Sequence, residues 1–276
     1  MTNAEPNVLL LAVIYRNHGE VEEFCRRLKE TNGDDVRIVV CDNSPRAEQA
    51  QILNADLTVG RPDNPGYLDG GIEALKASLE AGWELPAWTA LSNTDLDFGS
   101  GRAFLTLGTY DPSKPIIIAP SILEGASMTE KNPHVLQPRS RLRHRLNRIA
   151  TYTPTVAIAY LAVSALRVRG RTSRPTPPAP SDGRMYSPYG ALIIFSNAFV
   201  SRFGLPAGVP LLAEEWAVAE HARSTDTPVV FEPRISVLHD PHSTTGGKVT
   251  RRRGAMLSRA FRHVARGWKG HDVWTP

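Results

Sequence analysis

Trp88-Thr-Ala-Leu-Ser-Asn-Thr-Asp-Leu-Asp-Phe98 begins as an apolar run and ends in polar and acidic residues. The apolar part, up to Leu91, predicts a buried strand, and Asn93, Asp95 and Asp97 follow where that strand would leave the sheet. Ligands of open parallel α/β sheets bind at the carboxyl ends of the strands, where carboxylates can converge without being buried unpaired. Two acids two residues apart can hold a divalent cation such as Mg²⁺ there. The alternative interpretation is an acidic turn that ends the strand and caps the next helix.

The 276-residue length and the 41% hydrophobic content predict a soluble globular protein with one large α/β domain or two small ones. Cys25 falls on the apolar face of an expected helix and Cys41 inside an expected strand. Their spacing fits neither a metal site nor a redox pair, so both are expected to be buried, reduced thiols in a cytosolic protein. The N-terminus lacks a basic region before its apolar run, so no signal peptide is expected.

Charge is distributed unevenly along the chain. Residues 139–184 hold ten arginines and one acid, a net charge of +9, and residues 248–276 hold eight basic residues and one acid, a net charge of +7. Because the whole chain carries +4, the rest carries −12. Two basic segments attached to an acidic body suit an anionic surface such as a membrane or a nucleic acid, although each segment alone could be a solvated basic face.

The N-terminal region reads as strand, helix, strand. A nearly continuous apolar run at 8–15 and a second one at 36–41 are typical of buried parallel strands, and Val21, Phe24, Cys25 and Leu28 lie between them at helical spacing. The first strand is not followed by Gly-x-Gly-x-x-Gly, which argues against a dinucleotide-binding dehydrogenase. Further strands are expected at 57–59, 116–119, 189–196, 228–232 and 235–238, and helices at 47–53, 72–79, 199–203, 211–223 and 250–268.

Two stretches between these elements have other possible uses. The glycines of Asn64-Pro-Gly-Tyr-Leu-Asp-Gly-Gly71 precede or begin a helix, where backbone N–H groups can approach an anion, or they simply form a turn. The apolar segment 152–168 would span roughly 25 Å as a helix, against the ~30 Å hydrocarbon core of a membrane. It therefore suits an interfacial helix flanked by arginines, or a helix packed on the domain.

Taken together, the motifs of this chain resemble those of the inverting GT-A glycosyltransferases of family 2, particularly the rhamnosyltransferase and galactofuranosyltransferase-like group. The resemblance runs from about residue 8 to 246 and follows the family's order. It rests on Tyr15-Arg-Asn17, Cys41-Asp-Asn-Ser44, Asn64 to Gly71, Leu91-Ser-Asn-Thr-Asp95, Tyr189-Gly-Ala-Leu192, Glu214-Glu215, and His239 near Ser243.

The resemblance implies an α/β fold of the GT-A type, a Rossmann-like nucleotide-diphospho-sugar transferase domain with a mostly parallel central sheet flanked by helices. That domain would cover 1–246 and contain the basic and apolar insert 139–185, and 247–276 would be a basic helical tail. A UDP- or dTDP-sugar donor would lie across the carboxyl edge of the sheet. Its nucleotide would be bound by Tyr15, Asn17, Asp42, Asn64, Gly70, Asn93 and Asp95, with Asp42 accepting from the pyrimidine base.

The resemblance also implies a metal ion and a base. Asp95 and His239 would hold Mg²⁺ or Mn²⁺ on the diphosphate. Asn93 replaces the first acid of the family's Asp-x-Asp motif, so the metal would rest mainly on Asp95, or Asp97 would contribute. The family's base is the second acid of a pair, which is Glu215 here, with Glu214 as the alternative; an acidic first helical turn is the other interpretation.

Two other histidines are weaker candidates. His242 is a second candidate ligand in the loop of His239, and His221 is expected to serve packing or to lie on the surface.

The expected function is therefore sugar transfer in cell-surface polysaccharide synthesis by a hexosyltransferase-type enzyme. The acceptor would be a glycan or a polyprenyl-linked molecule, and the protein would be cytoplasmic or peripheral at the inner face of the cell membrane, on an anionic surface. A nucleotidyltransferase is disfavoured because no glycine-rich loop with Arg or Lys follows the first strand. A nucleic-acid-binding protein is disfavoured because the body is acidic and the arginine segments lack interleaved aromatic residues.

Overall fold

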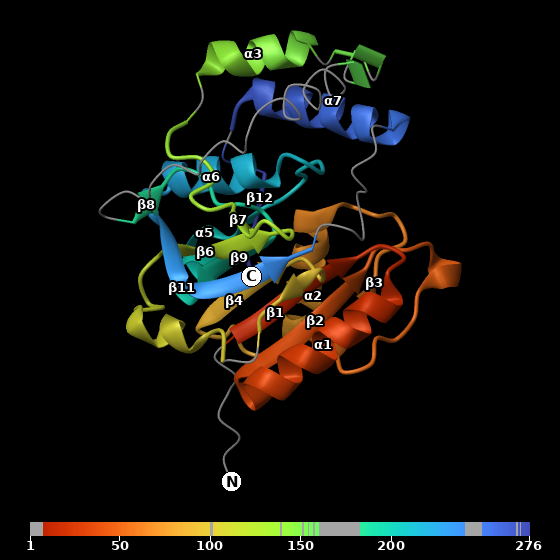
Figure 1. Cartoon of the computed structure of the whole chain (residues 1–276), viewed down its shortest axis with the longest axis vertical. Coiled ribbons are helices and arrows are strands. Elements are labelled where there is room, and N and C mark those ends of the chain that lie inside the picture. The colour runs from red at the N-terminus through yellow and green to blue at the C-terminus, as the bar shows by residue number, and fades with distance from the viewer. Residues whose placement is uncertain are drawn as a thin grey trace.

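A mixed sheet of ten strands forms the centre of the part of the chain that the structure describes (Figure 1). The structure is a computed structural model that describes residues 8–99, 102–138, 140–150, 152–153, 155–156, 158–159, 183–240, 250–268, 270 and 272–276. The strands are β1 Val8–Ile14, β2 Val36–Asp42, β3 Leu57–Gly60, β4 Trp88–Ser92, β6 Ile117–Glu124, β9 Leu192–Ser196 and β11 Val229–His239, with the short β5 Leu96–Asp97, β7 Thr129–Glu130 and β8 Arg184–Met185.

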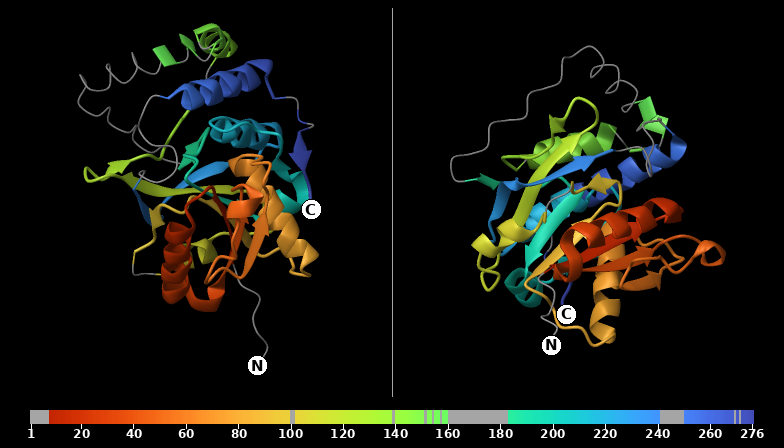
Figure 2. Two further views of the ribbon diagram at one scale, coloured as in Figure 1. Left: turned by 90° about the vertical axis from the view of Figure 1, so that its right-hand side faces the viewer. Right: turned by 60° about the horizontal axis from the view of Figure 1, so that its bottom comes forward.

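The order across the sheet is β3-β2-β1-β4-β9-β6-β11-β5, with β7 on β6 and β8 on β11. Strands β3, β2, β1, β4, β6 and β11 run in one direction, and β9 runs against them between β4 and β6. Helices cover the sheet (Figures 1 and 2). The expected α/β fold class, with a mostly parallel central sheet flanked by helices, is confirmed.

The sheet is buried on both faces, which is why its strands read as continuous apolar runs. One core joins Leu10, Ala12 and Ile14 of β1 to the apolar side of α1 (His18–Asn32). The other joins the alternate residues of β1 to the helices of the opposite face. Those helices are α2 Tyr67–Glu80, α5 Asn197–Phe203 and α6 Glu214–Ser224.

Two further helices form an outer layer beside α6, in which α3 (Arg141–Ala150) and α7 (Arg251–Arg266) pack side by side (Figures 1 and 2). The chain then returns to the body, because β12 (Val273–Trp274) pairs with β10 (Leu205–Pro206). The sequence predicts α7, but it does not predict the α3 helix. Among the described residues, no helix has the length and apolar character that a membrane span requires.

Several expectations need correction. The predicted helix at 47–53 is wrong: only a 3-10 turn, Arg46–Glu48, forms there, and the Gln49 side chain donates to the carbonyls of Asp42 and Ser44 at 3.1 and 2.9 Å, which fixes an irregular path. The strands expected at 228–232 and 235–238 are one strand, β11, with a shift of register between Glu232 and Ser236. Most of 152–168 and all of 241–249, with His242 and Ser243, lie outside the described residues.

Cys25 and Cys41 are buried free thiols, as expected. Burial raises the pKa of each thiol to about 12, so both stay protonated and unreactive at neutral pH.

Candidate functional site

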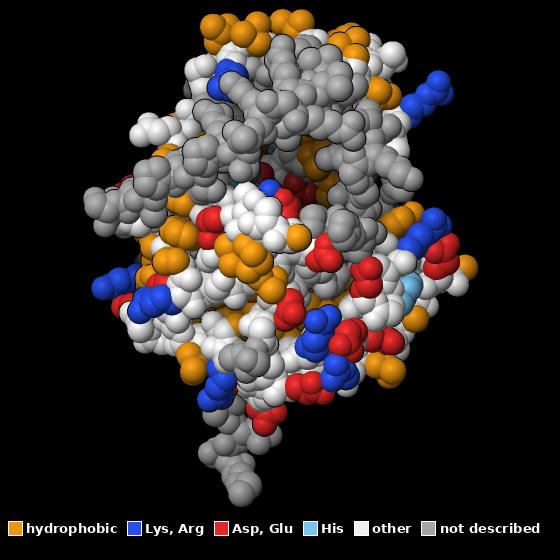
Figure 3. All heavy atoms as spheres, viewed as in Figure 1, with side chains coloured by type: hydrophobic (Ala, Val, Ile, Leu, Met, Phe, Trp, Pro, Cys, Tyr) orange, Lys and Arg blue, Asp and Glu red, His pale blue; other side chains and the backbone are white. Residues whose placement is uncertain are grey.

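The parallel strands deliver their carboxyl ends to one edge of the sheet. The last residues of β1, β2, β4, β6 and β11 all lie along this edge, and β9, which runs the other way, begins there. Polar residues at these strand ends, including Asp42, Glu124 and His239, therefore face a common region although they are far apart in sequence. In the space-filling view, acidic side chains gather in a hollow on this part of the surface (Figure 3).

Asp95 and His239 meet at the centre of this edge. The Nε2 atom of His239 lies 3.3 Å from Oδ1 of Asp95, and the backbone N–H of Asp240 donates to the Asp95 carbonyl at 3.2 Å. The other ring nitrogen of His239, Nδ1, lies 3.5 Å from Oε1 of Glu124. Both side chains of the central pair are largely buried, 12% exposed for Asp95 and 5% for His239. The imidazole is thus fixed between two carboxylates.

The distance between the Asp95 and His239 donor atoms is compatible with two ligands of one divalent metal ion. Adjacent ligands of an octahedral Mg²⁺ with bonds of ~2.1 Å are about 3 Å apart, close to the 3.3 Å between these two donor atoms. Within the described part of the chain, no three or more His, Cys, Asp or Glu side chains are grouped to hold a metal ion. A metal here would therefore take two protein ligands and complete its shell with substrate oxygens and water.

Asp97 is placed differently from Asp95. Its Oδ2 atom lies 3.5 Å from Nη1 of Arg27 on α1, and its Oδ1 accepts from the backbone N–H of Gly99 at 2.8 Å. It belongs to β5, which pairs with the end of β11, and its side chain is 46% exposed. Asp97 thus stabilises a turn and forms an ion pair, whereas Asp95 contacts His239.

Glu214 and Glu215 occupy the first turn of α6 but have opposite surroundings. Glu214 is 7% exposed, and its Oε1 atom forms no hydrogen bond with the described residues. Burial, and to a smaller extent the charge of Glu215, raises the pKa of Glu214 to about 7, although backbone N–H groups at the helix start oppose the shift. Near neutral pH a large fraction of Glu214 is therefore the uncharged acid.

Glu215 has a 34% exposed side chain that two neighbours hold in place. The backbone N–H of Gly190, just before β9, donates to its Oε1 atom at 2.8 Å. Its Oε2 atom lies 3.2 Å from Nε2 of His134. The His134 ring packs against Tyr189, which in turn has an edge contact with His239. A chain of contacts through His134 and Tyr189 therefore links Glu215 to His239.

Tyr67, the first residue of α2, experiences the charges of Asp95 and of the Glu214 and Glu215 pair. Its hydroxyl is buried and forms no hydrogen bond with the described residues. Burial raises its pKa well above 10, and the charges of Glu214, Asp95 and Glu215 raise it further. The hydroxyl is thus a buried, neutral group without a hydrogen-bond partner among the described residues.

A second polar group lies at the ends of β1 and β2. Asp42 is fully buried; its Oδ1 atom accepts from the N–H of Ser44 at 2.9 Å, and its Oδ2 atom is 2.7 Å from Nε2 of His18. Both oxygens of the expected base-binding carboxylate are therefore engaged already. His18, which is 27% exposed, is the side chain that presents this pair to solvent.

Asn17 joins this group to the acidic turn, since its Nδ2 atom donates to Oγ1 of Thr94 at 3.0 Å and its Oδ1 atom accepts from the N–H of Tyr15 at 3.2 Å. Asn93 follows β4 directly, and its N–H donates to the carbonyl of Ala191 at 2.8 Å. Three of the expected nucleotide-binding residues thus line one continuous turn region between β1 and β4.

Asn64 and Gly70 belong to the loop and helix start that follow β3. Asn64 is an exposed loop residue with a φ of 48°. Gly70 is buried, and a Cβ atom there would lie 2.7 Å from Cγ1 of Val13, so its small size is needed for packing α2 against β1. The glycine is therefore accounted for by helix packing as well as by any approach to a ligand.

Three side chains of this edge are not singled out by the sequence: His18, Glu124 and His134. Glu124 and His18 flank strands that the sequence identifies, so the strand-end rule could have found them had β6 been extended beyond residue 119. His134 lies in a segment without a chemical motif, and only its contacts mark it. Tyr67 and Tyr189 lie inside two of the motifs that carry the resemblance, but the sequence gives neither side chain a separate role.

No protein-family model matches this chain, and no curated protein matches it. Among solved structures, it is similar to the mannosyltransferase PcManGT from Pyrobaculum calidifontis, in complex with GDP-Man and Mn²⁺. The identity is 14%, the alignment covers 96% of this chain and 72% of that chain, and the TM-score is 0.48.

Proposed function

We propose that this protein is an inverting, metal-dependent glycosyltransferase that uses a nucleotide-sugar donor. The observation that supports this most strongly is the grouping of two kinds of acid at the carboxyl edge of the sheet. Asp95 with His239 offers two donor atoms for a metal, and Glu215 is a separate carboxylate with a third of its side chain exposed. A transferase needs a metal site for the diphosphate and a separate base for the acceptor.

Asp95 and His239 would hold the Mg²⁺ or Mn²⁺ ion, which supplies positive charge against the leaving diphosphate. Glu124 lies at the far ring nitrogen of His239 and would orient the imidazole so that Nε2 faces the metal side. The Tyr67 hydroxyl would donate to a diphosphate oxygen, because its environment keeps it protonated. Asp97 would add no ligand, since it is engaged with Arg27 and Gly99.

Glu215 would act as the base. The acceptor hydroxyl gives its proton to the Glu215 carboxylate while its oxygen bonds to the anomeric carbon, and the bond from that carbon to the diphosphate oxygen breaks. One displacement inverts the anomeric centre and releases a nucleoside diphosphate. Glu214 suits this role less well, because it is buried and an acceptor hydroxyl cannot reach it as it can reach the partly exposed Glu215.

The nucleotide would lie toward the ends of β1 and β2. Asp42 and His18 form one buried pair whose exposed member is the imidazole, so base recognition would pass through His18 as well as Asp42. Tyr15, Asn17, Asn64, Gly70 and Asn93 would shape the nucleoside pocket. The proposed donor is a UDP- or dTDP-sugar.

The acceptor would be a glycan or a polyprenyl-linked molecule in cell-surface polysaccharide synthesis, and the transferred group a hexosyl-type sugar. A polyprenyl-linked acceptor resides in a membrane, which supports work at an anionic membrane face. The proposed organisation remains a transferase domain over 1–246 with the insert 139–185 and the basic tail 247–276.

The donor site is tested by thermal unfolding with UDP, dTDP and GDP, each with and without Mn²⁺. A ligand at about 100 times its Kd stabilises the native state by about 2.7 kcal/mol, which should raise Tm by about 5 °C for a chain of this size. We expect this rise with one nucleotide class and only when Mn²⁺ is present.

The metal assignment is tested by calorimetry on Asp95→Ala and His239→Ala, which should each lose Mn²⁺-dependent nucleotide binding while remaining folded. Asp97→Ala is the matched control, since it removes an acid from the same turn and should bind normally. Unchanged affinity in both ligand variants would remove the proposed metal site.

A further inference from the structure

The α3 and α7 layer stands on the helix that carries the proposed base. Trp216, the residue after Glu215, has edge contacts with His263 of α7 at 5.8 Å and with His144 of α3 at 6.5 Å between ring centroids. The layer is therefore anchored directly beside the acceptor side of the proposed site. Figure 2 shows both helices on the side of α6 away from the sheet.

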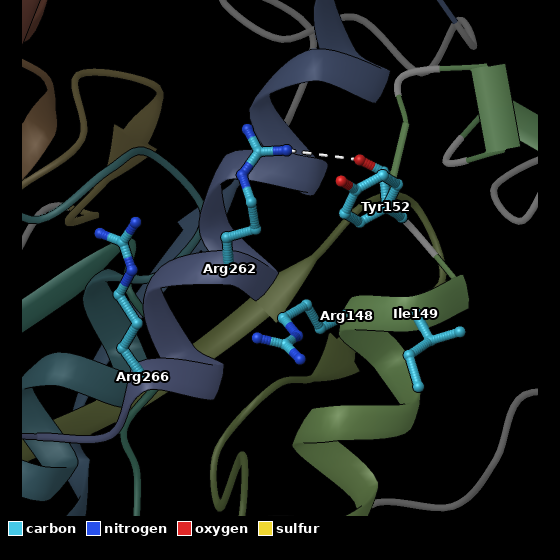
Figure 4. Close-up of a pocket in the computed structure, with 5 residues that line it drawn as sticks. All are labelled: Arg148, Ile149, Tyr152, Arg262 and Arg266. Carbon is cyan, nitrogen blue, oxygen red and sulfur yellow. Dashed lines mark hydrogen bonds between the residues drawn. The ribbon is translucent and has the colours of Figure 1, made fainter.

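A cleft between α3 and α7 is lined by arginines. Its volume is about 340 Å³, and its walls are Arg148, Ile149, Tyr152, Arg262 and Arg266 (Figure 4). Arg148 reaches from α3 toward α7, and Arg262 donates from α7 to the carbonyl of Tyr152 at 3.4 Å. An adjoining cavity of about 350 Å³ shares Arg262 and Arg266 and adds Arg259 and His263.

The positive charge of this cleft is not neutralised by the described residues. The segments 141–150 and 251–266 contain no Asp or Glu, and within the described chain Arg148, Arg259, Arg262 and Arg266 form no ion pair. Burial lowers the pKa of His263, so the charge near neutral pH comes from the guanidinium groups. Three arginines without an ion pair to a described residue at this cleft, with Arg259 at the adjoining cavity, favour a phosphate-bearing ligand.

The outer side of α3 is apolar. Leu142, Leu146 and Ile149 are 66%, 56% and 64% exposed, and their spacing places them on one face of the helix. Figure 3 shows hydrophobic side chains along this end of the molecule. Such a stripe beside arginines is typical of a helix that lies in the interface of a membrane.

We propose that the α3 and α7 layer docks on an anionic phospholipid membrane. The cleft arginines bind lipid phosphate groups, and Leu142, Leu146 and Ile149 enter the boundary between headgroups and acyl chains. The phosphates of a nucleic acid would bind the arginines, but a nucleic acid has no apolar region that would bury Leu142, Leu146 and Ile149. The docked layer would turn the Glu215 side of the protein toward a membrane-held acceptor, and this consequence rests on the proposed function.

The test is sedimentation of the full chain with phosphatidylcholine vesicles, with and without phosphatidylglycerol. Arg148→Gln/Arg262→Gln/Arg266→Gln is compared with Arg26→Gln/Arg46→Gln/Arg202→Gln. Both variants lose three positive charges, but only the first loses them from the cleft. A third variant, Leu142→Gln/Leu146→Gln/Ile149→Gln, changes the apolar stripe alone.

We expect binding to the anionic vesicles only, and a fall in the partition coefficient on the order of 100-fold for the cleft variant, from three near-surface arginines. The control should bind like the unchanged protein, and the stripe variant should bind more weakly with its salt dependence retained. Equal binding by the cleft and control variants would overturn the proposal. Stabilisation by inorganic phosphate, or capture of RNA, without vesicle binding would also overturn it in favour of a soluble ligand.

The outcome can be separated from that of the proposed function. Each variant is also tested for the Tm rise with nucleotide and Mn²⁺. If the unchanged protein does not bind vesicles but keeps the nucleotide response, docking is contradicted and the transferase is not. Vesicle binding without any nucleotide response supports docking and contradicts the transferase.

Discussion

Replacing Glu215 by Gln tests the proposed chemistry most directly. The amide keeps the shape of the side chain, and its oxygen can still accept from the Gly190 N–H that now donates to Oε1 at 2.8 Å. The charge opposite His134, 3.2 Å away, is lost, but the side chain is a third exposed, so that contact should contribute no more than ~1 kcal/mol to the free energy of unfolding. The variant should therefore fold normally.

Turnover should respond differently, because the amide cannot take the proton of the acceptor hydroxyl. General base catalysis contributes ~10²–10⁴-fold, so we expect kcat to fall by ~10²-fold or more, equivalent to at least ~2.7 kcal/mol in the activation barrier. Donor affinity should hardly change, since the proposed metal and diphosphate contacts lie at Asp95 and His239. The loss would then fall on a step that follows donor binding.

The assay is release of nucleoside diphosphate in the presence of acceptor, with donor affinity measured separately by calorimetry. Glu214→Gln is the matched control, because it makes the same chemical change one residue away on the buried side of α6. If Glu214→Gln loses turnover and Glu215→Gln stays active, the base has been assigned to the wrong residue. If both variants stay active, the acidic pair only begins the helix and inversion needs another base.

Two further predictions concern stability. The folded protein raises the pKa of Glu214 from 4.5 to about 7, so the stability that the protonated form provides is complete below about pH 4.5 and is lost as the pH rises through 7. Glu214→Gln should therefore match the parent near pH 5 and exceed it by ~3 kcal/mol near pH 8 in urea unfolding; an equal difference at both pH values would contradict the shift. Gly70→Ala would place a Cβ 2.7 Å from Val13 and should lower the free energy of unfolding by ~1–3 kcal/mol, measured by the same method. Gly19→Ala is the control: a Cβ there meets no atom within 4 Å, so no loss of stability is expected.

The sequence by itself determines most of the secondary structure that builds the site edge. Continuous apolar runs indicate β1, β2, β4 and β9, because a sheet covered on both faces buries mostly apolar side chains. The helical spacing of Val21, Phe24 and Leu28 is equally clear. Polar residues directly after such runs have to lie at a sheet edge, and this rule alone places Asp42 and Asp95 there.

Contacts between residues that are far apart in the sequence are predicted only by the resemblance to a known family. The local sequence does not predict the contact between His239 and Asp95. It also does not predict that β9 lies between β4 and β6 and runs antiparallel to both. Buried strands look alike whichever neighbour they pair with, since hydrogen bonds between strands involve the backbone. The contacts of Glu124 with His239 and of His134 with Glu215 are not predicted by the sequence either, because these partners are remote in sequence.

The distinction between Glu214 and Glu215 is decided only by the tertiary structure. Two adjacent acids at a helix start have the same intrinsic pKa and the same local preference for the first turn. Consecutive helical residues point about 100° apart, so the packing of α6 against the sheet turns one carboxyl inward and leaves the other toward solvent. Sequence supplies the pair of acids, and only burial, which depends on every element packed around α6, determines which of them solvent and an acceptor can reach.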